Sequence, residues 1–443
     1  MSSLRSCAIG LSVAAWMLSP APAAAQPYPP STVILEMTID TANHDRRAPG
    51  SDNWPMTWAE DGHQYSSWGD GGGFNGTNQD GRVSLGVARI EGSADSHTGI
   101  NVWGGKDPEA AATFEGKSYG IISICGQLYM WVSPGSATQG YQSQTLHVSS
   151  DHGHSWSPVS WSFTLADGVL HPTFVQFGQD YAGARDSYVY IHAVRIQSTS
   201  ELAVQQPGQI DLFRVPAGAL EDRNAYEFFA GLDANDEPEW TSDLTARQPV
   251  FEDAQGVGWN VSVSYNAPLQ RYLLCTEHTA TFQGNLGLFD APEPWGPWTT
   301  VRYDTDWEGF GSTFFWNFAN KWLSSDGKGF TMVFTGIGDN DSWNTVSGTF
   351  DAVSPPPGEG GGGMGGGTGT GGSGTGATGT GGGTAGAPPV SGGGAEEEGD
   401  CACRLPGRPV HTPWSQLAWT ALALGALVGR HRASSRRAAR TGP

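Results

Sequence analysis

The chain contains little cysteine and little positive charge. Of its 443 residues five are cysteine, and only Cys125 and Cys275 lie away from the two ends. Both follow apolar residues and no Cys/His metal motif is present, so we expect buried thiols; whether they form a disulfide stays open. The chain has 23 Lys and Arg residues and 44 Asp and Glu residues, which gives a net charge of −21. This balance argues against nucleic acid as a partner.

Several signatures of enzyme chemistry are also missing. No serine nucleophile elbow is found, and the glycine-rich run at 69–73 is not followed by the lysine and helix of a phosphate loop. The acidic turns 233–236 and 339–341 could hold a structural calcium ion, but neither completes a calcium-loop pattern. We therefore expect no cofactor.

The two ends of the chain read as targeting segments. Residues 1–25 contain Arg5, an apolar run and a final Ala23-Ala24-Ala25, which predicts a signal peptide. An N-terminal anchor is the alternative, but the apolar run is short for a membrane span. Residues 354–400 are mostly Gly, Thr, Ser and Ala, which predicts a disordered linker.

Residues 401–443 contain Cys401, Cys403, a short apolar stretch expected to be helical, and a final group of arginines. This tail resembles the Cys-hydrophobic-Arg sorting signals of myxobacterial surface proteins. The resemblance implies that one of the two cysteines is the processing and anchoring point; whether Cys401 or Cys403 carries a lipid stays open. A plain C-terminal membrane anchor is the alternative. Either way we expect an exported protein attached to the cell surface or outer membrane.

Between these ends, residues 30–353 show strand patterns and no long amphipathic helix. Short β-branched and aromatic runs alternate with Gly, Pro, Asn and Asp. Five hairpin-like segments recur with room for four strands each: 57–70, 121–133, 173–193, 261–278 and 321–336. Regular four-stranded units predict an all-β, five-bladed β-propeller, which we expect to be monomeric.

Two further patterns support this architecture. Ser149, Asp151, Gly153, Ser155 and Trp156 fit S-x-D-x-G-x-[ST]-W, the Asp-box hairpin of sialidase-like propellers, in which the aspartate binds turn amides and has a structural role. The early strand 32–35 and the late strand 346–350 could share one blade and close the ring.

The first hairpin places two carboxylates at one end. Asp52 precedes its first strand, Glu60-Asp61-Gly62 is the expected turn, and Asp70 follows its second strand, so antiparallel pairing returns both acids to the same rim. Glu277 ends a hairpin on the same rim, which makes Asp52, Asp70 and Glu277 the catalytic candidates. The polar and aromatic residues expected on this rim are substrate-binding candidates: Asn53, Trp54, His171, Trp259, Asn260, His278, Trp316 and Asn317.

Paired carboxylates suit glycosidic bond cleavage, because one must stay protonated to serve the leaving oxygen while the other activates water or attacks. Asn and His bind hydroxyl groups, and Trp faces stack on sugar rings. Structural roles are the alternative: Asp52 could cap a turn, Asp70 could bind loop amides, and Glu277 could pair with Arg271. Which acid donates the proton stays open.

Segments 52–71, 180–192, 212–231, 265–278, 286–301 and 319–336 resemble a bacterial family of secreted five-bladed β-propeller proteins, long of unknown function, that includes endo-D-arabinanases. In those enzymes two aspartates flank the first hairpin, and Asp52 and Asp70 match them. Trp68 and Gly71 replace the Phe and Thr found there. The resemblance implies a furanosidase-type, endo-acting polysaccharide hydrolase, inverting if a water fits between the acids. A lectin or adhesin using the same rim without chemistry is the alternative.

Overall fold

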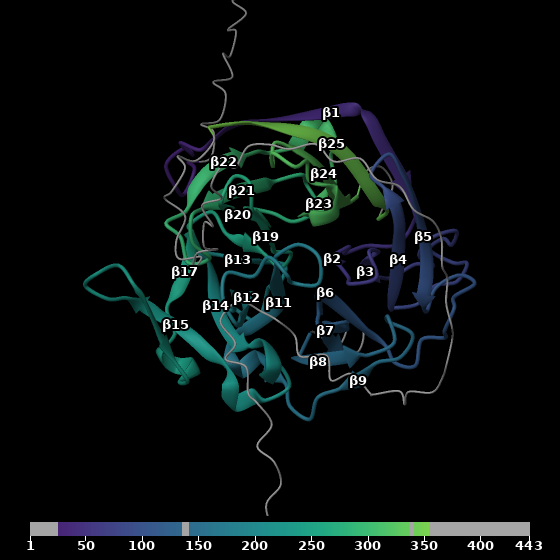
Figure 1. Cartoon of the computed structure of the whole chain (residues 1–443), viewed down its shortest axis with the longest axis horizontal. Helices are drawn as coiled ribbons and strands as arrows, with labels where there is room; N and C mark the ends of the chain where they lie inside the picture. The colour runs from purple at the N-terminus through teal and green to yellow at the C-terminus, as the bar shows by residue number, and fades with distance from the viewer. Residues whose placement is uncertain (1–24, 135–140, 337–340, 354–443) are drawn as a thin grey trace, which may run out of the picture. The chain divides into compact units, whose positions relative to one another are not determined.

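The computed structural model describes residues 25–134, 141–336 and 341–353 (Figure 1). These residues form β-strands joined by loops and short 3-10 helices, so the predicted all-β class is confirmed. The linker, the C-terminal segment with its expected helix, and the signal peptide up to residue 24 lie outside the described residues. Within the described part, no helix is long and apolar enough to cross a membrane.

The first hairpin opens a four-stranded antiparallel sheet in which each strand pairs with the next along the chain. Its strands are β2 (Met56–Trp58), β3 (Gln64–Gly69), β4 (Leu85–Ser93) and β5 (Ser96–Trp103). The second sheet is also antiparallel. Its strands are β6 (Gly116–Ile124), β7 (Gln127–Pro134), β8 (Ser143–Ser149), β9 (Ser157–Pro158) and β10 (Phe163–Thr164).

A ten-stranded sheet comes next and consists of two antiparallel halves joined by a parallel pairing of β11 with β19. The first half is β11 (Val169–Gln176), β12 (Tyr188–Arg195), β14 (Gly208–Pro216), β15 (Glu227–Leu232), β16 (Pro238–Thr241) and β17 (Pro249–Asp253). The second half is β19 (Ser262–Asn266), β20 (Arg271–Glu277), β21 (Leu286–Ala291) and β22 (Thr299–Tyr303). A small separate ladder joins β13 (Val204–Gln205) and β18 (Val257–Gly258).

The last sheet combines both ends of the domain. Its order is β1 (Ile34–Arg47), β25 (Trp343–Ala352), β24 (Gly329–Thr335) and β23 (Phe314–Phe318). Met37 is paired with Phe350, so the predicted closure by an early and a late strand is confirmed.

The expectation that the first strand of the last hairpin begins near Lys321 is wrong. The strand is the fully buried Phe314–Phe318, because this apolar run packs on both faces. Residues Asn320–Trp322 instead form the 3-10 helix η7, closed by a bond from Trp322 N to Ala319 O. The remaining 3-10 helices are η2 (Leu165–Asp167), η3 (Ala217–Ala219), η4 (Arg223–Ala225), η5 (Leu244–Ala246) and η6 (Trp307–Gly309).

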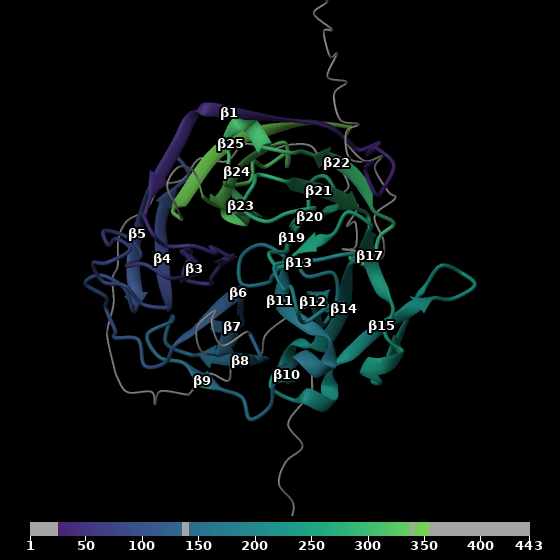
Figure 2. The ribbon, with the colours of Figure 1, turned by 180° about the vertical axis from the view of Figure 1, so that it is seen from behind.

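The sheets follow one another in cyclic order around a centre, and the strands that lie next to this centre are β2, β6, β11, β19 and β23 (Figures 1 and 2). β6 contacts both β3 and β11, β11 pairs with β19, and β19 contacts β23. The last and first sheets meet through Trp343 and Trp54, whose rings pack edge to face at 5.2 Å. Apolar burial between sheets, at about 25 cal/mol per Å², thus holds the ring together.

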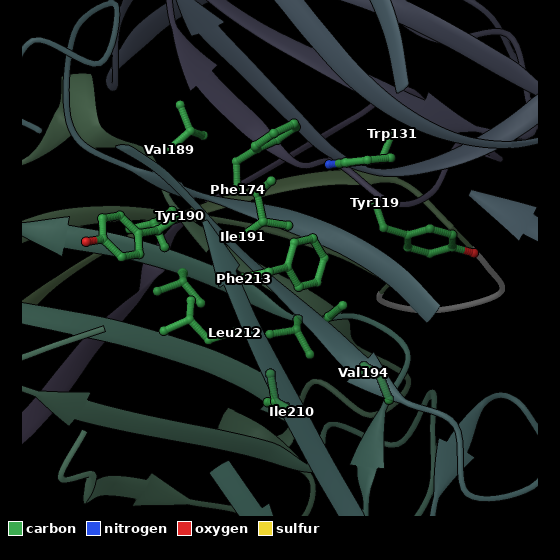
Figure 3. Close-up of a cluster of buried hydrophobic side chains, with 14 of the residues drawn as sticks. Tyr119, Trp131, Phe174, Val189, Tyr190, Ile191, Val194, Ile210, Leu212 and Phe213 are labelled. Atoms are coloured by element: carbon green, nitrogen blue, oxygen red, sulfur yellow. The ribbon is translucent and has the colours of Figure 1, made fainter. Parts of the chain in front are cut away.

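The largest buried cluster joins β6, β7, β11, β12 and β14, and Figure 3 shows its side chains interdigitating. The predicted Asp box is also present: Asp151 accepts bonds from the backbone N and Oγ of Ser155, at 2.9 and 2.6 Å, while Trp156 is buried. Its structural role is confirmed.

Cys275 is a buried free thiol and is therefore not paired with Cys125.

Candidate active site

Asp52 and Asp70 lie at the same end of the first hairpin. The backbone of Asp52 exchanges two hydrogen bonds with Gly69, at 2.8 and 2.7 Å, which extends the β2–β3 pairing beyond the strands. Asp70 is the next residue and has a left-handed backbone, with φ of 55°. The antiparallel return predicted from the sequence therefore places both carboxylates beside one another.

Gly69 allows this close approach because it has no side chain. A Cβ there would collide with Oδ1 of Asp52 and would lie 2.9 Å from Nζ of Lys117. The carboxylate of Asp52 and the ammonium of Lys117 therefore occupy the space above the same glycine.

Lys117 comes from β6 of the neighbouring sheet and connects the two acids. Its Nζ lies 2.5 Å from Oδ1 of Asp70, although its side chain is only 5% exposed. Asp70 also pairs with Arg82 at 3.1 Å and stays 33% exposed. Burial alone would lower the pKa of Lys117, but the charges of Asp52 and Asp70 outweigh it and the pKa is raised. Lys117 is therefore a buried cation that is paired with Asp70 and is also stabilised by the charge of Asp52.

Asp52 has a different environment from Asp70. Burial raises the pKa of Asp52 to about 7, helped by the charges of Asp341 and Asp70 and opposed by Lys117 and by a bond from Asn53 Nδ2 at 3.0 Å. The pKa of Asp341 is itself raised, by burial and by the charge of Asp70. Near neutral pH, Asp52 can thus hold a proton beside an Asp70 that has two cationic partners.

Aromatic side chains form a wall next to this charged group. Tyr119 stacks on His171 with ring centres 3.6 Å apart, and Tyr141 meets both His171 and Trp259 edge to face. The charges of Asp52 and Asp70 act on both tyrosines. Burial lowers the pKa of His171 to about 3, so its ring is neutral. His171 and Trp259, both predicted substrate-binding residues, therefore contact the tyrosines on which the two acids act.

Glu277 lies apart from this group, among its own hydrogen-bond partners. It is fully buried and accepts bonds from Asn260 Nδ2, from Thr281 Oγ1 and from the backbone N of Phe282, at 2.9 to 3.2 Å. Burial raises its pKa to about 7, against these hydrogen bonds. In the described residues neither Asp52 nor Asp70 is among its partners. Burial, and not the charge of Asp52 or Asp70, therefore raises the pKa of Glu277.

Several other residues predicted on the rim pack against other side chains of the protein. Trp54 is fully buried among Trp68 and Trp343, and Trp316 is 1% exposed beside Trp307, so neither has a face free for a sugar ring. The reason is that both point between sheets. His278 stacks on Tyr303 at 3.8 Å and its Nε2 bonds the carbonyl of Asp304.

The polar residues predicted on the rim also form hydrogen bonds within the protein. Asn53 is buried and orients Asp52, and Asn260 bonds Glu277. Asn317 donates to the carbonyl of Phe315 and borders a cavity of about 10 Å³ between the sheets, room for about one water. Arg271 pairs with Asp290 at 2.7 Å, so the alternative pairing with Glu277 does not occur.

Sequence reasoning missed Lys117, Tyr119, Tyr141 and Asp341. One signal was present: Lys117 is the only charged residue in β6, whose nine residues are all buried. A lone charge in a buried strand requires a partner, which points to a site. Asp341 gave no such signal, because it follows other polar residues in an acidic turn. Among the described residues, no group of three or more His, Cys, Asp or Glu side chains could hold a metal ion.

A family described as a domain of unknown function (DUF4185) matches residues 108–323, a range that includes Lys117 and Glu277 and begins after Asp70. No curated protein matches the chain.

Solved structures similar to this chain include glycoside hydrolases. The endo-arabinase of Bacteroides thetaiotaomicron is 9% identical, with a TM-score of 0.39, over 72% of this chain and 98% of that one. A GH43 enzyme of Xanthomonas citri is 12% identical, with a TM-score of 0.39, over 69% and 93%. The exo-β-1,3-galactanase of Phanerochaete chrysosporium is 11% identical, with a TM-score of 0.39, over 70% and 63%. At scores this low the likeness carries no argument about the reaction.

Proposed function

We propose that this protein is a polysaccharide-cleaving glycoside hydrolase built on a five-bladed β-propeller, with Asp52 and Asp70 as the reacting pair. The observation that carries the proposal is the placement of both carboxylates around the Lys117 ammonium in unlike environments. Asp52 has a raised pKa and tends to keep its proton, whereas Asp70 lies between two cations. A glycosidase needs one carboxyl group that is protonated and a second that is ionised.

In the proposed reaction Asp52 donates its proton to the glycosidic oxygen as the bond from that oxygen to the anomeric carbon breaks. Asp70 removes a proton from the water whose oxygen bonds to the anomeric carbon, which inverts the configuration. Lys117 stabilises the negative charge that moves between the two carboxylates during this exchange. Asn53, through its bond to Asp52, orients the acid.

The substrate class we propose is a polymer of furanose sugars, with arabinan as the first to test. The support is the resemblance of the sequence to a family that includes endo-D-arabinanases, in which Asp52 and Asp70 match the paired aspartates. Within the aromatic wall next to these acids Trp259 is only partly buried, and its ring suits a neutral sugar ring, which binds through apolar faces and hydroxyl groups. The wall consists of Tyr119, Tyr141, His171 and Trp259.

The test compares Asp52→Asn, Asp70→Asn and a control, Asp351→Asn, which removes an exposed carboxylate from β25. Release of reducing ends is measured on a panel of furanose and pyranose polysaccharides and on aryl glycosides with a good leaving group. We expect Asp52→Asn to lose activity on polymers but to keep much of it on the aryl glycosides, which need no proton donor. Asp70→Asn should lose both. Native rates in both variants would refute the proposal.

One observation favours a second candidate, a lectin-like surface protein. Both carboxylate oxygens of Asp70 are engaged, one by Lys117 and one by Arg82, as in a structural ion-pair network. A binder would retain polysaccharide on an affinity gel without releasing any reducing ends, and would do so equally in the Asp70→Asn variant.

We also propose that the protein is exported and attached to the cell surface, on the support of residues 1–25 and 401–443 of the sequence. Fractionation of cells that produce the full chain should place it in the surface fraction. Replacing Cys401 and Cys403 together by Ser should release it to the medium.

A further inference from the structure

The loop between β20 and β21 is organised by the buried carboxylate of Glu277. The side chain of Thr281 and the backbone N of Phe282 both donate to it, while Asn285 Nδ2 donates to the carbonyls of His278 and Ala280. The loop is therefore bound from both ends, although it lies at the surface.

This arrangement imposes an unfavourable conformation on a bulky residue. Phe282 has φ of 59° and Thr279 has φ of 64°, in the left-handed region that is unfavourable for such residues. Phe282 is nevertheless 42% exposed, one of the few large apolar side chains on the described surface. A strained backbone that displays an aromatic ring to solvent points to a function for that ring.

Phe282 continues the aromatic wall of the site. Its ring packs against Phe314 at 4.6 Å and lies 6.1 Å from Trp259. Trp259 in turn meets Tyr141 at 5.5 Å, and Tyr141 is within the electrostatic influence of Asp52 and Asp70. A series of ring contacts therefore leads from Tyr141, on which the charges of the acids act, to the surface.

Buried polar atoms border the same path. Nε2 of His171 and Nε1 of Trp259 are buried and have no hydrogen-bond partner within the part of the chain that the structure describes. His171 is 1% exposed, and an unpaired polar atom at that depth is costly unless a ligand or water satisfies it. Apolar ring faces with a few unsatisfied donors and acceptors match the chemistry of a saccharide.

We propose that Trp259 and Phe282 form a saccharide-binding subsite beyond the point of cleavage, and that Glu277 is a positioning residue that holds Phe282 there. The occupant is a neutral sugar unit of the same polymer chain whose glycosidic bond lies at Asp52 and Asp70. The inference rests on the proposed function and deepens it, since a subsite of this kind selects long substrates over short ones.

The experiment compares Phe282→Ala, Phe282→Trp and the control Leu232→Ala, which truncates another exposed apolar side chain. We measure kcat and KM on a polymer, on oligosaccharides of increasing length and on an aryl monosaccharide. We expect Phe282→Ala to raise KM for the polymer about tenfold, the equivalent of about 1.4 kcal/mol. It should leave the aryl monosaccharide unaffected, and Phe282→Trp should restore the polymer KM.

Glu277→Ala tests the positioning role, because it removes the oxygen that accepts from both Thr281 and Phe282. It should reproduce the length-dependent rise in KM with kcat on the aryl monosaccharide unchanged, whereas Glu277→Gln, which keeps one acceptor oxygen for the loop, should retain the native KM. Loss of kcat on that short substrate would instead place Glu277 in the chemistry. Equal losses by Phe282→Ala on short and long substrates would overturn the subsite while leaving the hydrolase proposal intact, which is tested separately by Asp52→Asn and Asp70→Asn.

If the protein only binds polysaccharide, calorimetric titration with the same oligosaccharides measures the affinities that test the subsite. Affinity that rises with chain length in the native protein and not in Phe282→Ala supports the subsite. Identical affinities in the two proteins overturn it.

Discussion

The ammonium of Lys117 lies 2.5 Å from the carboxylate of Asp70 and close to that of Asp52, in a side chain that is only 5% exposed. The two acids come from the first sheet and the lysine from the second, so the site exists only where the two sheets meet. This contact places a positive charge among the carboxylates of Asp52 and Asp70. Lys117 is therefore the residue whose replacement should change activity most.

Lys117→Met should reduce activity about 100-fold, because the two carboxylates lose the cation that lies between them. Folding stability should fall by about 1–3 kcal/mol, less than for a fully buried pair because Asp70 is partly exposed. Steady-state kinetics and urea denaturation give the two values, and Lys117→Arg serves as the charge-preserving control. A fully active Lys117→Met protein would exclude this role.

Gly69→Ala should abolish most of the activity. The added methyl group collides with the Asp52 carboxylate and approaches Nζ of Lys117, so one of them must leave its place. Gly329→Ala is the matched control, since its new methyl group meets only Ser324 at 3.2 Å. Activity assays and thermal melts of the two variants check this, and equal activities would mean that the carboxylate position is not needed.

The pH profile should reflect Asp52. Its pKa is raised to about 7, so the protonated acid required for leaving-group protonation disappears as the pH rises through 7. We expect kcat/KM on a polymer to fall on the alkaline side with a midpoint near pH 7. Asp52→Asn should remove this limb from the residual activity on aryl glycosides, and an unchanged limb would assign it to another group.

Folding stability should depend on pH through Glu277. Its pKa in the folded protein is about 7, above the 4.5 of an exposed glutamate, so the folded state binds more protons between these values. The stabilisation is complete below pH 4.5 and is lost as the pH rises through 7, by about 3 kcal/mol at most. Urea unfolding at about pH 5 and about pH 8, on either side of the folded pKa, should show a smaller pH-dependent difference in Glu277→Gln than in the native protein.

How far the site could be predicted from sequence depended on whether its contacts are local. The return of Asp52 and Asp70 to one end follows from a single hairpin, and the Asp box follows from a short run of consecutive residues. Both predictions are confirmed because their hydrogen bonds form within one hairpin or turn. Trp54 and Trp316 could not be placed this way, because Trp343 and Trp307, which lie outside their hairpins, help to bury them.

The sequence by itself determined the all-β class, four of the five hairpin units, the pairing of the first strand with the last, and the placement of two acids on one hairpin. These depend on strand propensity, turn residues and antiparallel pairing. Only the tertiary structure decided that Lys117 enters between those acids and that Glu277 occupies its own pocket. The physical reason is that burial and charge neutralisation are set by residues from other sheets, whose approach no local pattern encodes.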